Sequence, residues 1–185
     1  MIHSNLKKSK GQTISIVMLM FLASIMLHLF LILSMDYKQN FIRYHEALNA
    51  EHVTLAIKKT KQELEPFLVE TLEKDARTDQ YEIDDVKVAS GSFAYNGGEI
   101  KADFVCLEKE EAKKRLIGTV EIIEDSNYTS GVYLPLIYGM DNQISVGSDI
   151  KITLNNKEVT YKVCGFINSI MAGSHNCGVT MILFT

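Results

Sequence analysis

A stretch of 25 residues without a charged side chain lies between Lys10 and Asp36. Its apolar part, residues 13–34, reads TISIVMLMFLASIMLHLFLILS. At about 1.5 Å per residue, a helix of this length spans roughly 33 Å, which matches the hydrocarbon core of a bilayer. A buried helix of a soluble protein is the alternative, but such helices rarely stay apolar on every face over this length. The stretch therefore predicts one transmembrane helix over residues 13–34.

A cleaved signal peptide would also be apolar and would also follow basic residues such as Lys7, Lys8 and Lys10. The apolar core of a signal peptide is about 7–15 residues long and ends in a cleavage site of small residues. Here the apolar run is longer and leads into residues 33–37 (LSMDY), which contain no such site. We therefore expect the segment to stay attached.

The charges beside the stretch indicate its orientation. Residues 1–10 carry three lysines and no acid, whereas Asp36 and Lys38 mix both signs just beyond the stretch. Cationic flanks stay cytoplasmic, so residues 1–12 are expected in the cytoplasm and the rest of the chain outside it. All 23 acidic residues lie beyond residue 35. That acidic part offers no electrostatic footprint for nucleic acid, which is therefore not an expected partner.

Residues 35–129 predict a stalk followed by an α+β lobe. Aromatic and leucine residues recur at helical spacing over residues 35–50, so the membrane helix should continue outward as a stalk. The β-branched run at residues 51–57 (EHVTLAI) predicts a first strand. A capping-box pattern at residues 60–63 then opens an amphipathic helix, which Pro66 should kink or delay. Strands are further expected at 86–88, at 92–95 and 99–107 around the turn Asn96-Gly97-Gly98, and at 119–123, with a solvated helix at 108–116.

Residues 130–170 predict a small β-rich lobe. Residues 131–135 form a strand that ends at a proline, and residues 136–140 a helical turn. Two further strands, 150–154 and 159–166, flank the turn Asn155-Asn156 and form an antiparallel hairpin. Residues 171–185 begin a return segment, in which the apolar run 179–184 is strand-like and is expected to be an exposed strand edge if the chain ends there. The predicted fold class is α+β, with one membrane helix and two outer lobes.

Two parts of the chain carry a family resemblance. Residues 5–12 (NLKKSKGQ) form a basic segment directly before the membrane helix. In the C-terminal third, residues 132–135 (VYLP), 144–149 (ISVGSD) and 161–166 (YKVCGF) follow one another around a strand. These motifs resemble those of FtsX-like, MacB-type ABC transporter permeases, from which the chain departs by having Ser148 between the glycine and the aspartate.

The resemblance implies a first membrane helix, an extracytoplasmic porter-like lobe at residues 51–129, a β-rich lobe at residues 130–170, and three later membrane helices. No second apolar stretch of spanning length occurs in residues 36–185. The chain is therefore expected to be the N-terminal part of such a permease, unable to transport alone. Its implied partners are the bilayer of a bacterial plasma membrane, an ABC ATPase subunit, and a second copy through the stalk.

The search for catalytic chemistry predicts no enzyme and no catalytic, cofactor-binding or metal-binding residue. The chain contains no HExxH, GxSxG, P-loop or Rossmann pattern. Cys164, His175 and Cys177 lack the paired spacing of a zinc site. Three cysteines cannot form a fully paired disulfide framework, and Cys106 and Cys164 lie in apolar runs that predict buried free thiols.

His28 is the one ionisable residue within the apolar stretch. An ionisable group inside a membrane is a functional candidate. A neutral imidazole that faces a partner helix is the simpler interpretation, and it is favoured because one residue does not make a proton relay.

Two functions follow from these patterns. The first is a membrane-spanning permease component of an ABC transporter, for export or mechanotransmission. The alternative is a stand-alone single-pass surface protein whose outer α+β domain binds or senses a ligand.

Overall fold

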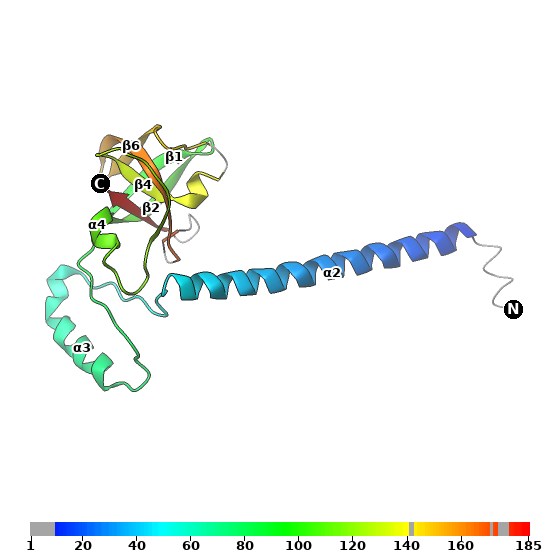
Figure 1. The fold of residues 1–185 in the computed structure, drawn as a ribbon, viewed down its shortest axis with the longest axis horizontal. Coiled ribbons are helices and arrows are strands. Elements are labelled where there is room, and N and C mark those ends of the chain that lie inside the picture. The colour runs from blue at the N-terminus through cyan, green and yellow to red at the C-terminus, as the bar shows by residue number, and fades with distance from the viewer. Residues whose placement is uncertain (1–9, 141–142, 171, 174–177) are drawn as a thin grey trace. The chain divides into compact units, whose positions relative to one another are not determined.

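The computed structural model describes residues 10–140, 143–170, 172–173 and 178–185, apart from the side chains of residues 59, 60 and 62. The chain divides between Tyr44 and His45 into two compact units. Its fold is α+β, with one long apolar helix near the N-terminus followed by a sheet-rich domain (Figure 1).

The long helix is α2, which runs from Lys10 to Ala47 without interruption. It contains the predicted membrane stretch and most of the predicted stalk in one element. No residue of α2 is buried. The helical periodicity at residues 37–48 therefore predicted the continuation of the helix correctly.

The sheet-rich unit also contains four short helical segments and, in the described residues, seven strands joined in one sheet. The helical segments are η1 (Lys59–Leu64), α3 (Glu65–Lys74), α4 (Lys109–Ala112) and η2 (Leu136–Tyr138). The strands are β1 (Lys87–Tyr95), β2 (Gly98–Glu108), β3 (Glu121–Asp125), β4 (Val132–Pro135), β5 (Asp149–Leu154), β6 (Lys157–Asn168) and β7 (Val179–Phe184).

Six of these strands close into a barrel. The sheet order is β3-β6-β4-β7-β2-β1-β5, and β5 pairs with β6 as well as with β1. The ring β6-β4-β7-β2-β1-β5 is therefore closed, which removes most of its free edges. The first half of β6 pairs with β5 and its last residues pair with β3, so β3 is an addition to the ring.

Two tight turns establish the antiparallel hairpins. Asn96 and Gly97 join β1 to β2 with φ values of 52° and 70°, and Asn155 and Asn156 join β5 to β6 with φ values of 48° and 65°. Asparagine and glycine tolerate these left-handed conformations, which match the twist of paired strands. Both predicted hairpins are confirmed by the pairing of these strands.

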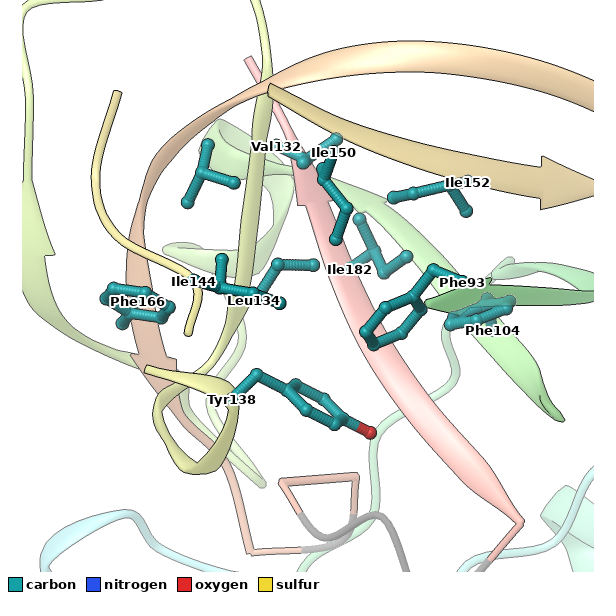
Figure 2. Packing of buried hydrophobic residues seen from close by; sticks show 11 residues of the cluster. Phe93, Phe104, Val132, Leu134, Tyr138, Ile144, Ile150, Ile152, Phe166 and Ile182 are labelled. Carbon is teal, nitrogen blue, oxygen red and sulfur yellow. The ribbon is translucent and has the colours of Figure 1, made fainter. Parts of the chain in front are cut away.

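The barrel is apolar on both surfaces along β4, β7 and the second half of β6. These strands pair partly in parallel, β4 with β6 and β2 with β7. Strands buried on both faces are expected to be continuous apolar runs rather than alternating ones. The inner cluster (Figure 2) contains Phe93, Phe104, Val132, Leu134, Tyr138, Ile144, Ile150, Ile152, Val163, Phe166 and Ile182. The outer cluster contains Leu107, Ala112, Tyr133, Cys164, Ile167, Ala172, Met181 and Leu183.

The expected boundary between residues 129 and 130 does not separate two sheets. Strands β1 and β2, from the expected porter-like lobe, pair with β5 and β7 from the expected β-rich lobe. The apolar run 179–184 is also not an exposed edge, because β7 lies between β4 and β2. The alternation of apolar and polar residues indicates which face of a strand is buried, but it does not predict which strand lies beside it. Both expectations were wrong for this reason.

Three local expectations also differ from the structure. Residues 51–57 form no strand and are largely exposed. The helix expected at 108–116 is the single turn α4, and the strand expected at 119–123 is shifted to β3. The α-helix α3 begins at Glu65 with Pro66 in its first turn, as the proline predicted.

Candidate functional site

The apolar surface of α2 is the most distinctive feature for function. Between Ile14 and Leu33 its large apolar side chains are exposed, from 39% at Ile25 to 72% at Met26. In water such exposure is unfavourable by about 25 cal/mol for each Å². In the described part of the chain, α2 is the one helix long and apolar enough to cross a membrane. His28 lies within this surface and is itself exposed.

The C-terminal end of α2 is closed by a hydrogen-bonded cap that belongs to the sheet-rich unit. Asn49 has a φ of 42°, its backbone N–H donates to the carbonyl of Glu46 at 3.1 Å, and the N–H of Ala50 donates to that of His45 at 2.9 Å. This pair of bonds is the Schellman motif, in which a left-handed residue ends a helix. Asparagine is among the few residues that adopt this conformation readily.

The same cap is bonded to the loop at residues 116–119. The Asn49 side-chain amide donates to the carbonyl of Leu116 at 2.7 Å, and the N–H of Gly118 donates to the Asn49 carbonyl at 2.8 Å. The backbone N–H and the hydroxyl of Thr119 both donate to the carbonyl of Leu48, at 2.9 and 2.8 Å. Gly118 has a φ of 60°, a left-handed conformation that favours glycine at this position.

A polar cluster on the outer surface of the barrel joins α4, β3 and β4. Lys109 Nζ lies 2.9 and 2.8 Å from the two carboxylate oxygens of Asp125, and it donates to the Tyr133 hydroxyl at 2.6 Å. The Tyr133 hydroxyl in turn donates to Asp125. The Lys109 ammonium also lies 4.6 Å from the centroid of the buried Tyr133 ring, within cation–π distance.

The pKa values in this cluster all move away from neutrality. Hydrogen bonds from Lys109 and Tyr133 lower the pKa of Asp125. Burial raises the pKa of Tyr133, and its bond to Asp125 adds to the effect. For Lys109, burial lowers the pKa, but the bonds to Asp125 and Tyr133 outweigh it and the net pKa is raised.

These directions favour a structural role for the cluster. A general acid or base works best with a pKa near the operating pH. In this cluster the carboxylate is held ionised, the ammonium charged and the phenol neutral across the neutral range. The arrangement is therefore a charge-assisted network that joins α4, β3 and β4 on the outer surface of the barrel.

The cysteines and histidines are placed by the structure as follows. Cys164 is a buried free thiol, as predicted, and Cys106 is a free thiol that is only half buried. Burial raises the pKa of both thiols. Among the described residues no group of three or more metal-ligating side chains converges. His175 and Cys177 lie outside the described residues.

An open depression of about 470 Å³ lies over β1, β2 and β5. Polar and apolar groups both line it, and the hydroxyl of Ser90 is already bonded to Asp103 at 2.6 Å. Gly91 forms part of the floor, where an added Cβ would lie 2.1 Å from the carbonyl oxygen of Thr153. The depression therefore arises where two strands approach closely.

The motifs behind the family resemblance shape the barrel. In the motif at 144–149, Gly147 has a φ of 87° and donates its N–H to the carbonyl of Val163 at 2.8 Å, while the N–H of Val163 donates to that of Ser148 at 2.9 Å. In the motif at 161–166, an added Cβ on Gly165 would lie 2.0 Å from the carbonyl oxygen of Glu124. These motif residues therefore have structural roles in the barrel.

Comparison with family models and with curated proteins gives no match for this chain. The resemblance to the permease family therefore rests on the motifs alone.

Sequence reasoning missed two groupings that the structure brings together. Lys109, Asp125 and Tyr133 come from three separate elements, and no spacing rule joins them. The rings of His45 and His52 lie 5.0 Å apart between centroids, on either side of the cap at Asn49. The asparagine at the end of a helical pattern was the signal that could have predicted the end of the helix between them.

Proposed function

We propose that this chain is a non-enzymatic, membrane-anchored component of an ABC transporter permease. The observation that carries the proposal is α2, whose exposed apolar surface is suited to a bilayer and which continues without a break to a capped end at residues 45–50. The motif resemblance supports the choice of family.

A helix that crosses the bilayer and continues beyond it joins the membrane to an outer domain through one continuous backbone element. The cap at residues 48–50 is held to the loop at 116–119 by several hydrogen bonds, so displacement of the helix end is passed to backbone that leads directly into β3. Such a link suits a protein that passes on conformational change driven by a separate ATPase subunit.

The proposed orientation places residues 1–12 in the cytoplasm and residues 36–185 outside it, because of the basic flank. An introduced cysteine at Asn96, in an exposed turn, tests this in intact cells. We expect an impermeant maleimide to label Asn96→Cys above the parent chain before permeabilisation. The matched control Ser9→Cys should be labelled only afterwards. The reverse pattern would overturn the orientation.

The permease assignment needs a separate test. We expect a gene for an ABC ATPase beside the gene for this chain, and we expect that ATPase to co-purify with the chain from detergent-solubilised membranes. An adjacent ATPase that does not co-purify, or a gene with no such neighbour, would overturn the permease assignment while leaving membrane anchoring intact.

A stand-alone surface protein that binds a ligand is the second candidate. The open depression over β1, β2 and β5 favours it, because it is open to solvent and polar side chains such as Lys101 and Asn156 lie among its lining residues. Ser90 and Asp103 in this depression are hydrogen-bonded to each other, so they are less available to a ligand. The depression is therefore weaker support for a function than α2. Normal labelling of Asn96→Cys together with no associated ATPase would favour this candidate.

A further inference from the structure

The part of α2 beyond the apolar stretch has an aromatic side and a polar side. Tyr37, Phe41 and Tyr44 follow one another at spacings of four and three residues, so they lie on one side of the helix. Their exposed fractions are 76%, 53% and 43%. Gln39, two residues from both Tyr37 and Phe41, lies on the opposite side. The residues Tyr37, Phe41 and Tyr44, here called the aromatic side of α2, therefore form an exposed surface along one line of the helix.

The continuity of α2 indicates what covers this surface. The helix passes without a break from the apolar stretch, which ends at Ser34, into residues 37–44. At about 1.5 Å per residue, Tyr37 lies roughly 5 Å and Phe41 roughly 10 Å beyond that end. The headgroup layer on each side of a bilayer is about 5–7 Å thick. An upright helix would therefore place Tyr37 in this layer and Phe41 beyond it.

The length of the apolar stretch favours a tilted helix. Residues 13–34 would span roughly 33 Å if α2 were upright, whereas the hydrocarbon core is about 30 Å thick. A stretch longer than the core is accommodated by tilting, and residues at the interface set the direction of the tilt. Tyrosine is suited to this position, because its ring is apolar and its hydroxyl is polar. Tilt toward the aromatic side brings Phe41 down into the headgroup layer.

The basic residues of this part of α2 fit the same layer. Lys38 and Arg43 lie to either side of the aromatic side, and the Arg43 guanidinium is 5.3 Å from the centroid of the Tyr44 ring. Long basic side chains lay their stems along apolar surface and extend their charged ends toward headgroups. Lipid phosphates are anionic, so rings and charges together match a lipid headgroup layer.

We propose that the aromatic side of α2 is a lipid-contact surface, toward which the helix tilts, and that Tyr37 and Phe41 lie in the headgroup layer. The first two turns after the apolar stretch then belong to the membrane contact, and the part of α2 in water begins near Tyr44. The inference rests on the proposed membrane anchoring. It does not depend on which side of the bilayer is cytoplasmic.

The test uses the full chain in liposomes of phosphatidylcholine and phosphatidylglycerol, with nitroxide-labelled headgroups in both leaflets. The chain contains no tryptophan, so a single introduced tryptophan reports one position. We expect strong quenching and blue-shifted emission for Tyr37→Trp and Phe41→Trp. Gln39→Trp is the matched control on the polar side. It should be quenched less than Phe41→Trp, although it lies about 3 Å closer to the apolar stretch along the helix axis.

This inversion of the order along the axis is the result that only a tilt toward the aromatic side gives. Quenching of Gln39→Trp that equals or exceeds that of Phe41→Trp would overturn the inference. Quenching of Phe41→Trp that falls as the protein-to-lipid ratio rises would show that a second copy, and not lipid, covers the aromatic side. A water-exposed stalk would leave Phe41→Trp unquenched. Either result would also overturn the inference.

A second measurement controls for reorientation of the helix by the new tryptophan. In the Tyr37→Trp variant, adding Phe41→Gln removes one interfacial ring and should reduce the quenching at position 37. Adding Gln39→Ala instead should leave it unchanged. Equal quenching with and without Phe41→Gln would contradict the role of Phe41. Extraction of the parent chain from liposomes by alkaline carbonate would instead overturn the membrane anchoring in the proposed function.

Discussion

The barrel at residues 87–184 and the segment at residues 51–86 use similar amino acids with opposite results. In the barrel, Phe104, Leu134 and Ile152 are completely buried. In residues 51–86 no described residue is buried, and Val53 is 85% exposed. Both regions contain β-branched and aromatic residues at periodic spacing. Apolar periodicity therefore describes what a segment can bury, and a core forms only where the chain supplies a second surface.

The barrel meets this requirement because its strands are partners of one another in a closed ring. The apolar side chains on its inner surface come from all six strands of the ring and form one cluster (Figure 2). The segment 51–86 has no such closure. It is held at the barrel by a few polar contacts, chiefly those of Glu82 and Asp84 with residues 115–117.

The largest expected effect comes from the same substitution in the two regions. Phe104→Ala should lower the free energy of unfolding by about 3–5 kcal/mol, because it removes a fully buried ring and leaves a cavity. Phe67→Ala should change it by less than about 0.5 kcal/mol, because Phe67 is 63% exposed. Denaturant titration of the chain in detergent, followed by tyrosine fluorescence, measures both. Similar losses would show that the segment 51–86 has a core of its own.

A second prediction concerns the close crossing of strands within the barrel. Gly165→Ala should cost about 1–3 kcal/mol, because the new Cβ would lie 2.0 Å from the Glu124 carbonyl oxygen and 2.8 Å from the Tyr133 ring. Gly98→Ala is the matched control, since its nearest contact would be 3.7 Å away. It should be nearly neutral in the same titration. A neutral Gly165→Ala would mean that β3 is not packed on β6 as described.

The sequence predicted the elements of this barrel better than their arrangement. The turns of both hairpins could be recognised from the sequence, because Asn-Gly and Asn-Asn favour left-handed conformations. The strand 131–135 and the helical turn after it were also predicted close to their observed positions. These features depend on residues that are neighbours along the chain.

The arrangement depends on contacts between distant residues, and sequence patterns do not encode it. The pattern of residues 179–184 predicts a buried strand, but it does not predict that β2 and β4 are its neighbours in the sheet. The run 51–57 reads equally as a strand and has no partner. The polar cluster at Lys109 was likewise hidden, because it exists only where α4, β3 and β4 meet.

A third prediction tests how the segment 51–86 is held. One oxygen of Glu82 accepts the backbone N–H groups of Leu116 and Ile117, at 3.0 and 2.8 Å. Glu82→Ala should weaken this attachment by about 1 kcal/mol. We expect limited proteolysis within residues 75–86 to become several-fold faster while the denaturation midpoint of the barrel is unchanged. Glu82→Gln retains an acceptor oxygen and should fall in between. A coupled loss of barrel stability would contradict the separation of the two regions.

The smallest expected effect is the pH dependence of the polar cluster on the barrel. The pKa of Asp125 is lowered in the folded chain by its bonds to Lys109 and Tyr133. A carboxyl whose folded pKa lies below its unfolded value of about 4 stabilises the fold above that pH, and the contribution is lost as pH falls through the folded pKa. Because the Asp125 side chain is 49% exposed, water screens the pair and the contribution should stay below about 1 kcal/mol.

Asp125→Asn should therefore be less stable than the parent at neutral pH, and the difference should shrink as the pH falls from about 5 to 2, where the parent carboxyl is protonated. Asp149→Asn is the matched control, because its pair with Lys162 lies on the surface. Denaturant titrations at several pH values measure the difference. Lys109 and Tyr133 have raised pKa values, so their contribution is complete below about pH 10 and is lost above it. A stability difference between Asp125→Asn and the parent that stays constant in acid would show that Asp125 acts through packing. The charge of this cluster would then contribute nothing to the stability of the barrel.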